Sequence, residues 1–200
     1  RKSAKFSAAQ KNVKSIKLEY VTAFGNVASA WEIFVHTVAE PAQSADGWLE
    51  QSKLHGYADS SESGRGPQLA FDGDWSDSDN HHPGWHSQWS ETSTVSDSKG
   101  KVTAEIDGDR ENNFYIVLDE AKTVDQVDIY ASWFEGHAGN GAVQTCKIYV
   151  SREAVTSNTP NIEWGKPVFD NTGNGFTYEN SHDTVKVADF GTTQNNVRSI

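Results

Sequence analysis

Apolar residues recur at every second position along most of this chain, and this alternation constrains the fold more than any other feature. A period of two places successive side chains on opposite faces of an extended strand. The alternation occurs in six runs, at residues 16–20, 31–35, 114–118, 127–131, 146–150 and 185–187. Turn-forming stretches rich in Gly, Asn and Asp separate these runs. Residues 7–17 have some helical character, but the alternation after them favours a strand. The sequence therefore predicts an all-β fold, an antiparallel sandwich of two packed sheets.

Length and composition limit the other possibilities. The 200 residues suffice for one domain, or for one domain and a fraction. No apolar run approaches the roughly 18 residues of a membrane-spanning helix. The single cysteine, Cys146, excludes an internal disulfide and a cysteine-based zinc site. The sequence contains no methionine, even at position 1, so we expect a mature or excised piece of a longer protein.

The charge of the chain is unevenly distributed. A net charge of −11 repels phosphate backbones and anionic lipid surfaces, so we expect neither nucleic acid nor an acidic membrane as a partner. The first 17 residues differ, because they hold six basic residues and no acid. We expect this basic arm to pair with an acidic protein surface.

A segment near the start of the chain is repeated at its end. Residues 4–16 read AKFSAAQKNVKSI and residues 188–200 read ADFGTTQNNVRSI, so seven of thirteen positions are identical at an offset of 184 residues. Two interpretations remain open. The segments are two similar strands of one sandwich, or the chain samples a tandem array of repeats out of register.

The tandem interpretation divides the chain in a definite way. Residues 1–40 would be the closing strands of one repeat, 41–48 a linker, and 49–200 a second repeat that lacks its own last strands. Residues 17–40 of the same or another chain would then complete the second sandwich, giving a permuted repeat or an exchange of strands between copies. Because unpaired strand edges are adhesive, we also expect some self-association.

Five motifs together resemble the discoidin family (coagulation-factor C-type domains), and within it the galactose-binding-like, family 32 carbohydrate-binding modules. The motifs are LAFDGDWSDSD with GWHSQW (69–79 and 84–89), FYIVLDEAKTVDQVDIY (114–130), NGAVQTCKIYVS (140–151), VKVADFGTTQNNVRSI (185–200) and VASAWEIFV (27–35). The last of these normally ends such a domain and here comes early, as the 184-residue offset predicts. The resemblance implies a jelly-roll-like sandwich.

The loop at 72–79 carries four aspartates and is a candidate cation site. Calcium takes six to eight oxygen ligands, and a loop with this many carboxylates can supply several of them. The alternative is an ordinary acidic turn exposed to solvent. The spacing does not fit an EF-hand. The resemblance implies a structural calcium ion, which would join the N-terminal segment to this loop. Its ligands would be the carbonyls of Leu69 and Trp31 and the side chains of Asp72, Asp74, Asp77 and Glu32.

Aromatic and histidine residues gather in predicted loops, as expected for a surface that stacks on sugar rings and bonds their hydroxyls. The candidate ligand-binding residues are His81, His82, Trp133, Phe134, His137, Asn140 and Phe176. The resemblance assigns sugar contacts to Asn140 and stacking to Phe176. Trp133 stands where galactose-binding members have Arg, which points to another glycan or to a protein ligand. Trp85, His86 and Trp89 are predicted to be core and corner residues.

Catalytic motifs are absent from the sequence, and Cys146 lies in an apolar run as a buried small hydrophobe. The sequence therefore predicts a non-catalytic, calcium-stabilised carbohydrate-binding module that anchors a larger secreted or cell-surface bacterial protein to glycans. The alternative is an adhesion or structural repeat that mediates protein association without a sugar site.

Overall fold

A computed structural model describes residues 2–24, 28–38, 47–74, 84–87, 92–96, 102–106, 112–130 and 142–176. These residues form an all-β fold with antiparallel sheets, as the alternation predicts. The strands are β1 (Lys2–Phe24), β2 (Ser29–Ala30), β3 (Glu32–Thr37), β4 (Gly47–Trp48), β5 (Leu54–Ala58), β6 (Trp85–His86), β7 (Thr92–Ser96), β8 (Val102–Ile106), β9 (Asn112–Tyr130), β10 (Val143–Ser151) and β11 (Phe169–Asp170). Two short 3-10 helices, η1 (Gln51–Lys53) and η2 (Pro67–Phe71), flank β5.

Within the described residues, nine strands are hydrogen-bonded into one sheet. Its order is β11-β10-β1-β9-β3-β4, with β5 on β9 and the β7–β8 pair on β1. Strands β2 and β6 form a separate pair.

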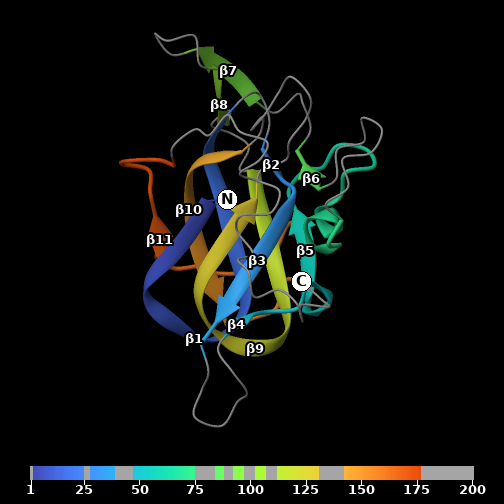
Figure 1. Cartoon of the computed structure of the whole chain (residues 1–200), viewed down its shortest axis with the longest axis vertical. Coiled ribbons are helices and arrows are strands. Elements are labelled where there is room, and N and C mark those ends of the chain that lie inside the picture. Colours follow the sequence, from blue (N-terminus) through green and yellow to red (C-terminus); the bar gives the residue numbers. More distant parts are fainter. Residues whose placement is uncertain are drawn as a thin grey trace, which may run out of the picture.

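Two long strands, β1 and β9, build both layers of the sandwich. Residues 15–20 of β1 pair with 112–117 of β9, and residues 2–5 of β1 pair with 126–129 of β9. Register shifts separate the two arms of β1, and Figure 1 shows both strands turning back at the lower end of the view. The first arm of β9 also carries β5, and the second arm carries β3. Each long strand therefore contributes side chains to the core from both layers of the sandwich, one arm in each layer.

The core consists of the alternate apolar positions of these strands. Their fully buried members include Ile16 and Leu18 of β1, Ile33 and Val35 of β3, Phe114, Ile116 and Leu118 of β9, and Cys146 and Ile148 of β10. Burying each such aliphatic or aromatic side chain contributes about 1.5–3 kcal/mol. Trp85 closes one end of the core, because its ring packs edge-on against Tyr20 and Phe114 at centroid distances of 5.5 and 4.9 Å.

Two sequence predictions differ from the structure in detail. The runs at 114–118 and 127–131 were expected to be separate strands, but β9 continues through both because Lys122 and Val124 remain paired with β1. The predicted linker 41–48 ends in β4, whose Trp48 pairs with His36 of β3. The predicted run at 185–187 lies outside the described residues.

The N-terminal strands are integrated into the body formed by the rest of the chain. β1 lies between β9 and β10, and β3 pairs with β9, all within one molecule. Residues 17–24 and 32–37 therefore occupy sheet positions beside strands that follow them by about one hundred residues in sequence.

Candidate functional site

A buried carboxyl group at the start of β3 is the centre of the candidate site. Glu32 is fully buried, and its backbone is fixed by pairing with Tyr130 of β9. The preceding residue holds the same register, because the Trp31 backbone N–H donates to the Tyr130 carbonyl at 2.7 Å. The pairing of β3 with β9 therefore fixes the position of Glu32 beside η1 and the loop that follows η2.

The Glu32 carboxyl is only partly satisfied by the protein. The Gln51 side-chain amide donates to Oε2 at 2.7 Å, while Oε1 is buried with no hydrogen-bond partner. The backbone of Gly73 and the side chain of Asp72 lie close enough to this carboxyl to influence its pKa. A buried acceptor without a donor destabilises the folded state by about 1–3 kcal/mol. Neutralisation of the Glu32 carboxyl by a proton or a cation therefore stabilises the folded state.

The acid–base state of Glu32 reflects this environment. Burial, followed by the negative charge of Asp72, raises the pKa of Glu32 to about 9. Because Glu32 is buried beside a second negative charge, its charged form is unfavourable unless a proton or a cation neutralises it. Without a cation, a proton on Glu32 fills that role at neutral pH.

The loop after η2 is shaped to bring its aspartates to Glu32. The chain leaves η2 at Phe71, and Gly73 takes a φ of 70°, a left-handed conformation that glycine adopts freely. The backbone N–H of Asp74 then donates to Asp72 Oδ1 at 2.9 Å. The Trp31 indole N–H donates to the Asp74 carbonyl at 2.8 Å, so the fully buried Trp31 fixes the loop to β3.

Gly84 packs against the same stretch of backbone. A Cβ at this position would lie 2.4 Å from the Ala30 carbonyl oxygen and 2.5 Å from the Trp31 Cα, and its φ is 100°. Only glycine fits this close approach without moving the strand that carries Glu32. The GWHSQW motif thus supports the site through its first residue, while Trp85 and His86 are buried, as predicted.

The residues present suit a hard cation in donor type. Calcium binds carboxylates, backbone carbonyls and amide oxygens, and the site offers the unpartnered Glu32 oxygen beside the exposed Asp72 carboxylate. Asp74 adds negative charge close to Glu32. Among the described residues, however, no group of three or more His, Cys, Asp or Glu side chains is placed to hold a metal ion. A cation here would therefore draw on two carboxylates together with backbone or amide oxygens.

The predicted metal ligands are partly brought together. Glu32, Asp72 and Asp74 interact electrostatically, and Trp31 contacts the same loop. Leu69 lies in η2, immediately before that loop. Asp77 lies outside the described residues.

Sequence reasoning missed Gln51. Its side chain is buried, and it positions Glu32 while its own Oε1 has no partner. A glutamine in a polar stretch carries no signal of this role, which follows only from the placement of η1 against β3.

The structure describes one member of the predicted sugar-binding set. Phe176 is half-buried, packs against the core and stacks on Phe169 at a centroid distance of 6.1 Å and an interplanar angle of 12°. Its backbone N–H donates to the Gln144 carbonyl at 2.6 Å. The other predicted members, His81, His82, Trp133, Phe134, His137 and Asn140, lie outside the described residues.

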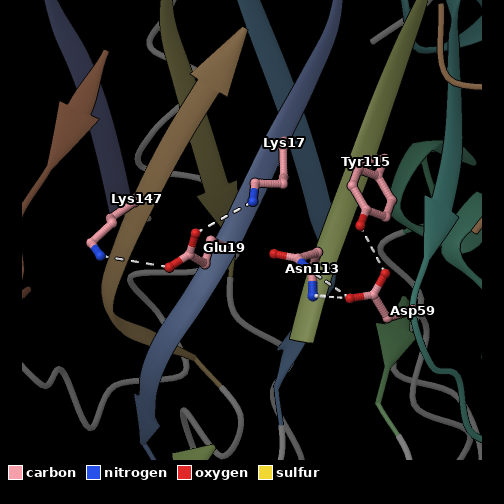
Figure 2. Close-up of polar contacts among 6 residues, drawn as sticks. All are labelled: Lys17, Glu19, Asp59, Asn113, Tyr115 and Lys147. Carbon is pink, nitrogen blue, oxygen red and sulfur yellow. Dashed lines mark hydrogen bonds and ion pairs between the residues drawn. The ribbon is translucent and has the colours of Figure 1, made fainter. Parts of the chain in front are cut away.

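A second polar cluster lies on the outer face of the sheet formed by β10, β1, β9 and β5 (Figure 2). Asp59 accepts hydrogen bonds from the Asn113 side-chain amide at 2.8 Å and from the Tyr115 hydroxyl at 2.9 Å. Glu19 lies between Lys17 and Lys147 at 3.4 and 3.7 Å. The contacts of Lys147 with Glu19 and of Asp59 with Asn113 and Tyr115 join neighbouring segments of the sheet, so we interpret the cluster as cross-strand stabilisation.

Comparisons with protein-family models, with curated proteins and with solved structures found no match for this chain. A search of the described residues for a helix long and apolar enough to cross a bilayer found none.

Proposed function

We propose that this chain is a non-catalytic, calcium-stabilised carbohydrate-binding module with a jelly-roll-like sandwich. It would anchor a larger secreted or cell-surface bacterial protein to glycans. The observation that carries the proposal is the buried Glu32 carboxyl, which faces Asp72 with one oxygen unpartnered. Both residues are among those to which the discoidin resemblance assigns calcium ligation.

The proposed ion is structural. It would join β3 to the loop after η2, two segments separated by about 40 residues in sequence. When bound, it supplies the positive charge that a proton otherwise supplies between Glu32 and Asp72. The Gln51 amide orients the Glu32 carboxyl, and Trp31 holds the loop in place. The ion would thus hold the loop end of the sandwich in the shape that presents a ligand surface.

Metal binding is tested by calorimetric titration of the chelator-treated chain with calcium, and with magnesium for comparison. We expect calcium to bind and to raise the melting temperature, and we expect Glu32→Gln to abolish both effects. Glu120→Gln is the matched control, because Glu120 is an exposed acid on β9. If calcium neither binds nor shifts the melting temperature of the wild-type chain, the metal part of the proposal is wrong.

Glycan binding is tested separately with a glycan array, followed by titration of any hit. We expect Trp133→Ala and Phe176→Ala to weaken binding while calcium still raises the melting temperature. A chain that binds calcium but no glycan would instead support an adhesion or structural repeat. The stacking of Phe176 on Phe169 favours this second candidate, because it gives the Phe176 ring a role in the fold itself.

A further inference from the structure

The structure of the first copy of the repeated segment explains which of its residues recur in the second copy. Residues 4–16 form part of β1 and pair with both arms of β9. Five of these thirteen residues are buried, and all five are identical in residues 188–200. The buried residues are Ala4, Phe6, Val13, Ser15 and Ile16.

The two remaining identities also have structural causes. Asn12 has a φ of 57°, and asparagine tolerates this left-handed conformation better than most residues. The half-buried Gln10 donates its side-chain amide to the Ala8 carbonyl at 2.7 Å. Ser15, among the buried five, accepts a hydrogen bond from the Val155 N–H at 2.8 Å.

The six substituted positions follow the opposite rule. Residues 5, 7, 8, 9 and 11 are exposed, and the half-buried Lys14 is replaced by Arg198, which keeps the charge. The ammonium of Lys14 donates to the Asp119 carbonyl, a contact that an arginine also reaches. Residues 188–200 thus keep every side chain that the position requires and vary where the position is tolerant.

We propose that the position filled by residues 4–16 is a strand-docking site with two occupants, and that residues 188–200 of the same chain are the second. Only one segment can fill the position at a time. Residues 4–16 have the advantage of direct continuity with 17–24, which pair with β9, β10 and β8. When residues 188–200 dock instead, the basic segment 1–16 is released.

The second occupant comes from the same chain because the tether before it is long enough to reach the docking site. Eleven residues separate Phe176 from Ala188, and an extended chain of that length spans up to roughly 36–40 Å. Phe176 is bonded to Gln144 near the start of β10, in a sandwich whose layers typically lie about 10 Å apart. A tether this short gives a high effective concentration, so docking within the chain exceeds docking between chains.

The test uses three full-length variants that place a charge in one or both copies. Phe190→Asp should melt at the wild-type temperature, because residues 4–16 still fill the position. The decrease in melting temperature caused by Phe6→Asp should be less than half of the decrease caused by the double variant Phe6→Asp/Phe190→Asp, since residues 188–200 replace the damaged strand. The double variant should melt lower than the wild-type chain by roughly 10 °C or more. Equal melting temperatures for Phe6→Asp and the double variant would overturn the proposal.

A cross-link reports the register directly. Lys5 lies opposite Gln126, and Asp189 is its counterpart in the second copy. In the Phe6→Asp background, Gln126→Cys with Asp189→Cys should form an intramolecular disulfide in a monomer. Lys5→Cys with Gln126→Cys in the otherwise wild-type chain is the positive control, and the native Cys146 is buried. A dimer joined by this disulfide would overturn the assignment to the same chain, and failure to cross-link with a working control would overturn docking in this register.

Discussion

Replacing Glu32 with glutamine should stabilise the metal-free protein while removing its response to calcium. Glutamine has the shape of a protonated carboxyl group, still accepts from the Gln51 amide, and carries N–H groups that can donate as a protonated carboxyl group can. Unlike glutamate, it has no charged form to be desolvated in the fully buried pocket. The substitution therefore removes the unfavourable electrostatic contribution of Glu32 and leaves its packing intact.

The size of the effect follows from the pKa. Burial and Asp72 raise the pKa of Glu32 to about 9, so the folded chain keeps this proton at pH 7 while the unfolded chain has released it. Because the folded state binds more protons, stability falls as pH rises from about 4.5 to about 9. At pH 7 this amounts to a destabilisation on the order of 3 kcal/mol, or roughly 10 °C in melting temperature for a domain of this size.

The assay is thermal unfolding in excess chelator at several pH values between 5 and 9, repeated with calcium. The metal-free wild-type chain should lose stability across this range, and Glu32→Gln should be more stable and lose less as pH rises. Calcium should stabilise the wild-type chain most at high pH, where binding competes with no proton, and should leave Glu32→Gln unchanged. A Glu32→Gln chain that melts below the metal-free wild type at pH 7, with an unchanged dependence on pH, would refute the reasoning.

Three further predictions concern the same end of the sandwich. Calcium binding at pH 7 should release a proton, measured as a difference in binding enthalpy between buffers of unlike ionisation enthalpy, and the release should decline as pH rises through about 9. Gln51→Ala should weaken calcium binding about tenfold or more, because it removes the donor that orients Glu32, whereas the exposed Lys53→Ala should not; equal affinities in a calorimetric titration would contradict this. Gly84→Ala should destabilise the chain in urea unfolding by roughly 1–3 kcal/mol more than Gly64→Ala, since both glycines have positive φ but only Gly84 lies against other backbone atoms; similar losses would show that the contact with Trp31 is unimportant.

The core was predictable from the sequence because its signal is local. Alternation alone identifies Ile16, Leu18, Ile116 and Ile148 as residues of one face, and all are buried. The path of β9 was not predictable in the same way, because the largely polar stretch 119–123 resembles a turn between strands. The pairing of Lys122 with Val13 keeps this stretch within the strand, and such pairing depends on contacts distant in sequence.

The candidate site was predictable only in part. Glu32 lies 40 residues before Asp72, and no spacing rule joins them; the order of the discoidin-like motifs alone suggested the association. Gln51 could not be found, because its role depends on where η1 packs. The stacking of Trp164 on Tyr115, at 5.9 Å, was likewise invisible, since it requires the segment after β10 to cross the outer face of the sheet. Sequence patterns report the side of a strand that is buried, but they do not report what packs against it.

The Glu32 site and the exchanged segment involve different edges of the second arm of β9. The second arm of β9 pairs with residues 2–5 of β1 on one side and with β3 on the other. Exchange of residues 4–16 for 188–200 alters the first of these edges, whereas the Glu32 site depends on the second. Residues 17–24, which lead into β2 and β3, stay in place in either case because their pairing with β10 and the first arm of β9 is unaffected. A calcium ion at Glu32 would therefore stabilise the part of the sandwich that both strand arrangements share, and its stabilising effect should be similar in Phe6→Asp and in the wild-type chain.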